Sequence, residues 1–234
     1  MGGGVGISIH GSNRIVTDTT SFALPECSIG LIPDVGSNFY LANAPGHFGE
    51  FVGLTGARLN ASDALYCGFA DDYIVTDNLE AMINELAKAG DPASITRFTS
   101  EASKSEMATI SDKVTEIFGQ NTLTDIIEVG VKCEVPVVQK AVKSLMQNSP
   151  LSLCVQFEAL NEIRKNPSVL ASFQQEYRFV SQVVEHGDFI EGIRAAIIVK
   201  DRSPNWKFDS VVNVPKQAVE LFRSIPEAGD LTFS

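Results

Sequence analysis

The chain has 234 residues, which suits one large domain or one domain with an appendage. Its 44% hydrophobic and 20% charged residues exclude a disordered chain. The net charge of −11 disfavours nucleic acid and anionic lipid as ligands, and no apolar run approaches the ~18 residues of a transmembrane helix. We therefore expect no nucleic-acid partner and no membrane partner.

The first third of the chain predicts short strands that alternate with short helices. Residues 2–11 predict a glycine-rich turn that opens a small-residue helix. Asn60 is placed to cap a later helix, and Gly68 to end it. The expected strands are residues 14–17, 21–24 and 73–75, the expected helices are 36–44, 48–54 and 61–67, and a loop with two prolines covers the residues between 24 and 36.

Beyond residue 75 the pattern becomes helical. Apolar residues recur at intervals of three and four, as in Leu79, Met82 and Leu86. Prolines stand near the expected helix starts, where a missing N–H does no harm. They are Pro92, Pro136, Pro150 and Pro167.

The chain opens on three consecutive glycines that run directly into apolar residues. This start predicts that Met1 is an internal methionine of a longer protein whose upstream strands precede it. The cluster at residues 2–6 has neither the Gly-Lys-Ser/Thr of a phosphate loop nor the spacing of a dinucleotide fingerprint. Its backbone can still approach a ligand closely and direct an amide N–H at an oxyanion. A tight helix-packing turn is the structural alternative.

Two carboxylates, Glu26 and Asp34, each follow a proline and are separated by an apolar run. A carboxylate fixed among apolar residues is a candidate for a raised pKa, which general acid–base catalysis requires. The alternative is a pair of loop carboxylates that cap helices. For Asp34, just before the expected helix at residue 36, N-capping competes evenly with catalysis.

The cysteines and histidines predict no metal site. Four scattered cysteines without a Cys-x-x-Cys pair are typical of reduced thiols in a core or on a helix face. The three histidines lack ligand spacing and are interpreted as ordinary polar residues. The chain has no Gly-x-Ser-x-Gly motif, so the sequence argues against the catalytic triad of an α/β-hydrolase. The apolar stripe of Phe189, Ile193 and Ile197 is interpreted as core.

Several motifs in the same order resemble the crotonase (enoyl-CoA hydratase/isomerase) superfamily, and most closely its 3-hydroxyisobutyryl-CoA hydrolase branch. The resemblance covers almost the whole chain and thins between residues 91 and 134. The motifs are MGGGVGIS at 1–8, PECSIGLIPDVG at 25–36, LTGARL at 54–59, SPLSL at 149–153, EYR at 176–178, GDFIEGIRA at 187–195 and KDRSPNW at 200–206.

The resemblance implies specific roles for residues of these motifs. In the family, two backbone amides hold the carbonyl oxygen of an acyl-CoA thioester, and one of them maps to Gly3. In the hydrolase branch the carboxylate that matches Glu26 attacks the thioester or activates water, and the one that matches Asp34 assists. Hydratases carry a second catalytic glutamate where this chain has Gly6, so the resemblance favours hydrolysis over hydration.

The resemblance also implies an α/β crotonase-like fold with repeated β-β-α turns, incomplete at the N-terminus, followed by a helical region. Residues 1–90 would form the C-terminal part of the crotonase-like core, and residues 91–234 the helical region. Upstream segments of the family supply the second oxyanion amide, so we expect the short chain to be nearly inactive alone.

A homo-oligomer is an open expectation. Lys200, Arg202 and Lys207 are available for CoA phosphates, although each fits a solvated surface charge better.

The implied function is hydrolysis of 3-hydroxyisobutyryl-CoA, as in valine breakdown, with the acyl-CoA as the partner and coenzyme A present only as part of the substrate. No metal or redox cofactor is expected. The alternatives are an enoyl-CoA hydratase or isomerase, and a catalytically impaired or non-catalytic interaction protein of the same fold. A bacterial protein of this kind would be cytoplasmic, and a eukaryotic one would be in the mitochondrial matrix.

Overall fold

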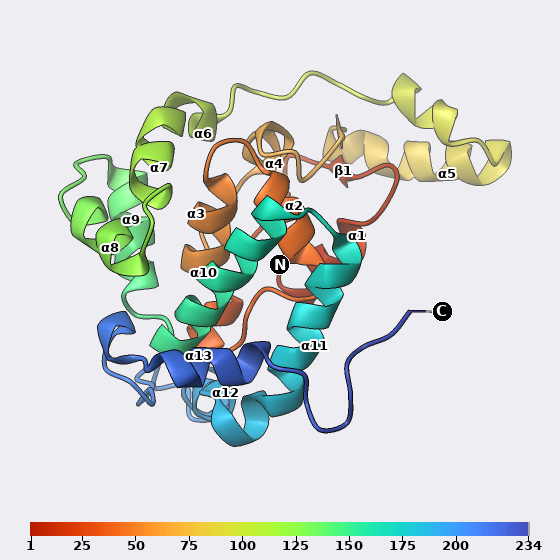
Figure 1. The fold of residues 1–234 in the computed structure, drawn as a ribbon. Helices are drawn as coiled ribbons and strands as arrows, with labels where there is room; N and C mark the ends of the chain where they lie inside the picture. Colours follow the sequence, from red (N-terminus) through yellow and green to blue (C-terminus); the bar gives the residue numbers. More distant parts are fainter. Residues whose placement is uncertain (234) are drawn as a thin grey trace.

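The structure, a computed structural model, describes residues 1–233 and is mostly helical (Figure 1). Two strands of two residues each, β1 (Ile15–Val16) and β2 (Asp72–Tyr73), pair in parallel. The α-helices are α1 (Gly3–Ser8), α2 (Ser37–Asn43), α3 (Phe48–Thr55), α4 (Ala61–Tyr66), α5 (Leu79–Ala89), α6 (Glu106–Thr109), α7 (Ser111–Phe118), α8 (Leu123–Gly130), α9 (Pro136–Leu145), α10 (Pro150–Lys165), α11 (Val169–His186), α12 (Phe189–Ile193) and α13 (Lys216–Arg223).

Local sequence signals position the early helices as expected. Asn60 caps α4, because its side-chain oxygen accepts the N–H of Asp63 at 3.0 Å. Gly68 follows the helix with φ of +75°, a conformation that glycine adopts without steric cost. The predicted helices at 36–44, 48–54 and 61–67 are confirmed as α2, α3 and α4.

The strand predicted at residues 21–24 is wrong. Only Phe22 forms a bridge, exchanging two backbone hydrogen bonds of 2.9 Å with Leu59. The pairing stops there because the next residue, Asn60, turns into the cap of α4. Phe22 instead stacks on Phe69 at 4.8 Å, so side-chain packing fixes this segment in place of a strand ladder.

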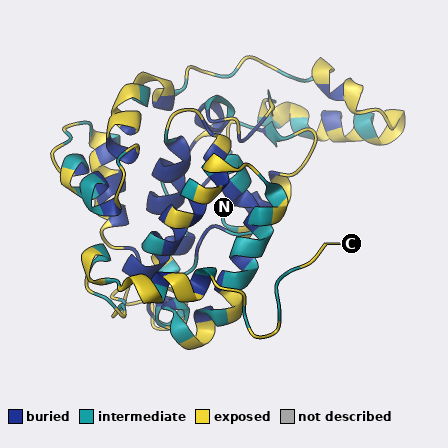
Figure 2. Ribbon diagram, viewed as in Figure 1, coloured by how far each residue is buried: buried dark blue, intermediate teal, exposed yellow. Residues whose placement is uncertain are grey.

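Helices α3 and α10 form the centre of the molecule (Figures 1 and 2). All eight residues of α3 are buried. Phe51 of α3 meets Phe118 of α7 edge to face at 5.3 Å. One hydrophobic cluster runs from Val5 to Ile163, so residues on both sides of position 90 share a core. Helix α5, in contrast, extends from the body and buries only Met82.

A second hydrophobic cluster fixes the segment that carries the two candidate carboxylates. Ile32, two residues before Asp34, is 1% exposed and packs with Phe179 of α11 and Phe222 of α13. Because Ile32 is buried under these two helices, the segment next to Asp34 is held at a defined place.

The prediction of core positions for the apolar stripe after residue 188 holds only in part. Phe189 and Ile193 are half-buried, but Ile197 is 56% exposed. After α12 the chain continues as a π-helix, Arg194–Ile198. The wider turn breaks the 3.6-residue spacing on which the prediction rested.

The four cysteines are free thiols, and Cys27 and Cys67 are buried, which confirms the core interpretation. Across residues 1–233, no helix combines the length and apolarity that crossing a bilayer demands.

Candidate active site

The glycine-rich start of the chain lies against the segment that carries Glu26. The N–H of Gly2 donates to the carbonyl of Ala23 at 3.0 Å. Gly2 has φ of +58°, and a Cβ added there would lie 3.2 Å from Oε1 of Glu26. Gly2 therefore passes directly beside the carboxyl group, and a side chain at this position would crowd it.

Glu26 begins a short 3-10 helix, η1 (Glu26–Ile29), and is only 6% exposed. Its Oε2 is buried without a hydrogen-bond partner among the described residues. Burial, helped by the nearby charge of Asp34 and opposed by the N-terminal amine, raises the pKa of Glu26 to about 7. A buried carboxyl group with an unpaired oxygen and a pKa near neutrality is suited to exchange a proton with a bound molecule.

Asp34 lies half-buried at the other end of the segment, close enough for its charge to act on Glu26. Burial raises the pKa of Asp34 as well. Asp34 does not cap helix α2, as the alternative interpretation predicted. The N-cap residue of α2 is Gly36, and no side chain caps this helix. Asp34 contributes its backbone carbonyl, which accepts the N–H of Ser37 at 3.2 Å.

Gly3 is the first residue of α1 and is exposed. Its N–H has no intrahelical acceptor, because the first turn of a helix leaves its amides unpaired. A Cβ on Gly3 would meet nothing within 4 Å, so the side-chain position of Gly3 is open. Gly3 thus presents a free donor one residue after the position that touches Glu26.

Gly6 lies on the same face of α1 as Gly2, one helical turn later. A Cβ at Gly6 would stand 2.6 Å from the Cβ of Val35. Any larger side chain, including a glutamate, therefore requires the segment next to Asp34 to shift.

Two residues near the carboxylates were not anticipated as part of the site. The Nε2 atom of His10 lies 2.6 Å from the carbonyl oxygen of Val35, and its ring stacks on Phe173. Glu176 accepts the N–H of Gly36 with both carboxylate oxygens. From the sequence alone His10 is interpreted as an ordinary polar residue, because the histidines show no ligand spacing. The Glu-Tyr-Arg motif at residues 176–178 marks Glu176 in the sequence. The sequence around this motif does not indicate that Glu176 contacts Gly36, 140 positions earlier.

A cavity of about 240 Å³ runs along α1, with Gly4 and Ser8 in its lining. These two residues lie on the side of α1 opposite Gly2 and Gly6. The cavity therefore does not open onto the carboxylates.

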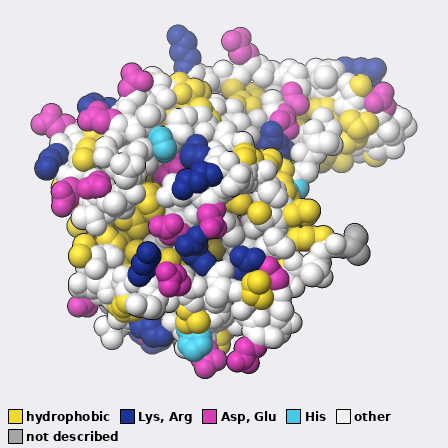
Figure 3. Space-filling view, in the orientation of Figure 1, with side chains coloured by type: hydrophobic (Ala, Val, Ile, Leu, Met, Phe, Trp, Pro, Cys, Tyr) yellow, Lys and Arg dark blue, Asp and Glu magenta, His cyan; other side chains and the backbone are white. Residues whose placement is uncertain are grey.

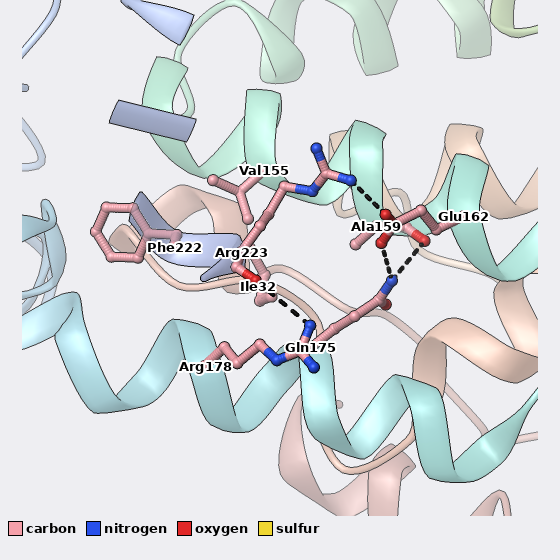
Figure 4. A pocket seen from close by; sticks show the side chains of 8 residues that line it. All are labelled: Ile32, Val155, Ala159, Glu162, Gln175, Arg178, Phe222 and Arg223. Atoms are coloured by element: carbon pink, nitrogen blue, oxygen red, sulfur yellow. Dashed lines mark hydrogen bonds and ion pairs between the residues drawn. The ribbon is translucent and has the colours of Figure 1, made fainter. Parts of the chain in front are cut away.

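A smaller cavity of about 60 Å³ lies between α10, α11 and α13 (Figure 4). Arg223 and Gln175 both donate to Glu162, and Arg178 donates to the carbonyl of Arg223. Acidic and basic side chains intermingle on this face of the molecule (Figure 3). Most of these polar groups pair with one another, although Gln175 Oε1 and Arg223 Nε are buried without a partner among residues 1–233.

The candidate phosphate-binding residues lie in the C-terminal segment. Lys207 Nζ donates to the carbonyl of His186 at 2.6 Å, while Lys200 and Arg202 are exposed and have positive φ angles. Within residues 1–233, no group of three or more His, Cys, Asp or Glu side chains is arranged to hold a metal ion.

Comparisons with known proteins agree on one family. A model of the family described as enoyl-CoA hydratase/isomerase matches residues 1–222. The chain is 31% identical to the mitochondrial 3-hydroxyisobutyryl-CoA hydrolase of Dictyostelium discoideum, covering 100% of this chain and 64% of that protein. It is 33% identical to 3-hydroxyisobutyryl-CoA hydrolase 1 of Arabidopsis thaliana, covering 99% of this chain and 65% of that protein. The chain thus spans slightly less than two thirds of these relatives.

A solved structure gives the same result for the fold. An enoyl-CoA hydratase from Rhodobacter sphaeroides 2.4.1 superposes with a TM-score of 0.92 and is 35% identical, covering 100% of this chain and 68% of that one. The predicted crotonase-like fold is therefore confirmed, although the described residues contain only a small parallel sheet.

Proposed function

The chain belongs to the enoyl-CoA hydratase/isomerase family, and from this membership we propose that it is an acyl-CoA thioester hydrolase acting on 3-hydroxyisobutyryl-CoA in valine breakdown. The observation that carries the proposal is Glu26: a buried carboxyl group with an unpaired oxygen and a pKa of about 7, beside the glycine start of α1. The names of the relatives from Dictyostelium and Arabidopsis support the substrate.

In the proposed reaction the thioester carbonyl oxygen accepts the N–H of Gly3, which stabilises negative charge as it develops there. Glu26 removes a proton from a water molecule, whose oxygen forms the new bond to the carbonyl carbon. The bond from carbon to sulfur breaks, and the departing thiolate takes up the proton held by Glu26 and leaves as coenzyme A thiol, which returns Glu26 to its carboxylate form. Asp34 assists beside the substrate, and its negative charge keeps the pKa of Glu26 high. This chemistry calls for no metal or redox cofactor.

Gly6 favours hydrolysis over hydration. Hydration of a double bond requires two acid–base groups, whereas thioester cleavage mainly requires one carboxylate and an oxyanion site. A second carboxylate at position 6 would collide with Val35. Enoyl-CoA hydration remains the second candidate, because the solved structure with a TM-score of 0.92 bears that name.

The two candidates are separated by measuring thiol release from 3-hydroxyisobutyryl-CoA and hydration of a short enoyl-CoA. Both assays use the 234-residue chain and a form extended by any in-frame upstream sequence. We expect thiol release from the extended form and little from the 234-residue chain, since relatives are longer than this chain. Hydration without thiol release would refute the hydrolase proposal. Sedimentation of the same samples tests the homo-oligomer, which stays a prediction.

The first prediction concerns the proposed base. Glu26→Gln should lower kcat for thioester hydrolysis by about 10²–10⁴-fold, because the amide cannot accept the proton. In the wild type, kcat/KM should rise with pH and level off above about 7, where Glu26 is ionised. Glu185→Gln, an exposed change on α11, is the matched control and should leave both unchanged. A Glu26→Gln variant with full activity would remove Glu26 from the mechanism.

A further inference from the structure

The backbone next to Asp34 is held in a conformation that it does not prefer. Val35 has φ of +58°, and Gly36 follows with φ of +73°. For a β-branched residue a left-handed conformation is sterically unfavourable. Contacts from elsewhere in the molecule must therefore hold residues 34–36 in place.

Those contacts come from two sides. On one side, His10, just beyond α1, meets the carbonyl oxygen of Val35 at 2.6 Å. On the other side, the N–H of Gly36 donates to Oε1 and Oε2 of Glu176, on α11, at 3.0 and 2.8 Å. A Cβ at Gly36 would stand 2.8 Å from His10 and 3.0 Å from Phe173, so this position admits only glycine.

Glu176 is 5% exposed, and no cation neutralises it. Helix α2, which packs on α11, carries no charged residue. Arg178, two residues further along α11, pairs with Asp230 instead. Asp34 is the charged group that acts on Glu176, while His10 lies across the loop. Burying a carboxyl group is unfavourable when only another acid faces it, so a stabilising role alone does not explain Glu176.

We propose that Glu176 is a positioning residue: through the amide of Gly36 it holds residues 34–36 so that the carboxylate of Asp34 stays beside Glu26. The proposal rests on the proposed function, because it assigns Glu176 to the same reaction. It also gives a role to the Glu-Tyr-Arg motif, which the assignment of Glu26, Asp34 and Gly3 leaves unexplained.

The link between Glu176 and Gly36 can be tested without any activity. Burial, helped by the charge of Asp34 and opposed by the bond from Gly36, raises the pKa of Glu176 to about 8. In wild-type protein labelled with ¹⁵N-glycine, the amide resonance of Gly36 should therefore shift with pH, with a midpoint near 8. Glu176→Gln should abolish this titration, and the matched control on the exposed side of α11, Glu185→Gln, should retain it.

The positioning role is tested by kinetics. Glu176→Ala should lower kcat for thioester hydrolysis by about 10- to 100-fold with KM within about twofold, since a misplaced catalytic group affects the chemical step. Glu176→Gln should recover most of kcat at pH 7, because its amide oxygen still accepts the Gly36 N–H. These rates are compared per folded protein, so that a loss of stability is not counted as a loss of catalysis.

Each outcome decides one of the two proposals. A Gly36 amide that does not titrate, or a Glu176→Ala variant with wild-type kcat, would overturn the positioning role. Should Glu176→Ala not fold, the amide titration and the kcat of Glu176→Gln decide the matter. Absence of thiol release in the extended form, with hydration of an enoyl-CoA in its place, would refute the hydrolase proposal while leaving the amide titration to report on the link.

Discussion

Glu26 and Glu50 are both buried glutamates, 6% and 1% exposed, yet their surroundings shift their pKa values in opposite directions. Burial acts to raise the pKa of Glu50, but His47, whose Nδ1 lies 3.3 Å from Oε1, and the hydrogen bonds and charge of Arg164 hold it below its ordinary value. In the described part of the chain no side-chain cation pairs with Glu26, and burial with the charge of Asp34 raises its pKa to about 7 against the lowering effect of the N-terminal amine. Burial alone therefore does not identify a functional acid.

The difference separates a structural carboxylate from a reactive one. Both oxygens of Glu50 accept hydrogen bonds from Arg164, at 3.0 and 2.7 Å, which ties α3 to α10 in the centre of the molecule. Oε2 of Glu26 has no partner among residues 1–233. A paired carboxylate stays ionised and inert, whereas an unpaired one is free to take up a proton from a ligand.

The largest effect on stability should come from breaking the paired site. Glu50→Gln should lower the free energy of unfolding by about 3–5 kcal/mol at pH 7, because Arg164 is left without its counter-charge. Urea denaturation measures the change. Glu162→Gln is the matched control: it removes the exposed partner of Arg223 and should cost at most about 1 kcal/mol. Equal stability of the two variants would mean that the buried pair does not hold α3 to α10.

Replacing Glu26, the unpaired carboxyl group, should change the stability in the opposite direction and make the protein more stable. A pKa that rises from 4.5 unfolded to about 7 folded contributes stability that is complete below pH 4.5 and is lost as pH rises to about 7. Glu26→Gln removes this loss and should be about 3 kcal/mol more stable than the wild type at pH 8, with no difference near pH 4. Unfolding curves from pH 4 to 8 test this, with Glu185→Gln as the exposed control. A variant that is less stable at pH 8 would indicate a hidden partner for Glu26.

The smallest effect concerns the contact that keeps α1 against the Asp34 segment. Gly6→Ala places a methyl group 2.6 Å from Val35 and should lower stability by about 1–3 kcal/mol. Gly4→Ala, two positions away on α1, meets nothing within 4 Å and should raise stability by up to about 1 kcal/mol. Thermal unfolding of the two variants compares them directly. If both were neutral, α1 would not be tightly packed on this segment.

Much of the local structure was predictable because the signals are local. The cap at Asn60, the stop at Gly68 and the prolines that begin α9 and α10 all act within one helical turn. The strand at residues 21–24 failed for the complementary reason. A strand needs a partner along its length, and the sequence of the strand does not state which segment lies beside it.

For the candidate site, the sequence by itself selected Glu26, Asp34 and Gly3 as residues whose chemistry suits the proposed reaction, and it assigned the family through motifs spread over the chain. Only the tertiary structure decided that Glu50 pairs with an arginine side chain while Glu26 pairs with no side-chain cation of residues 1–233, and that Glu176 reaches Gly36 across 140 residues. A carboxyl group's pKa depends on the charges and donors within a few ångströms, and folding, not sequence neighbourhood, brings those groups together.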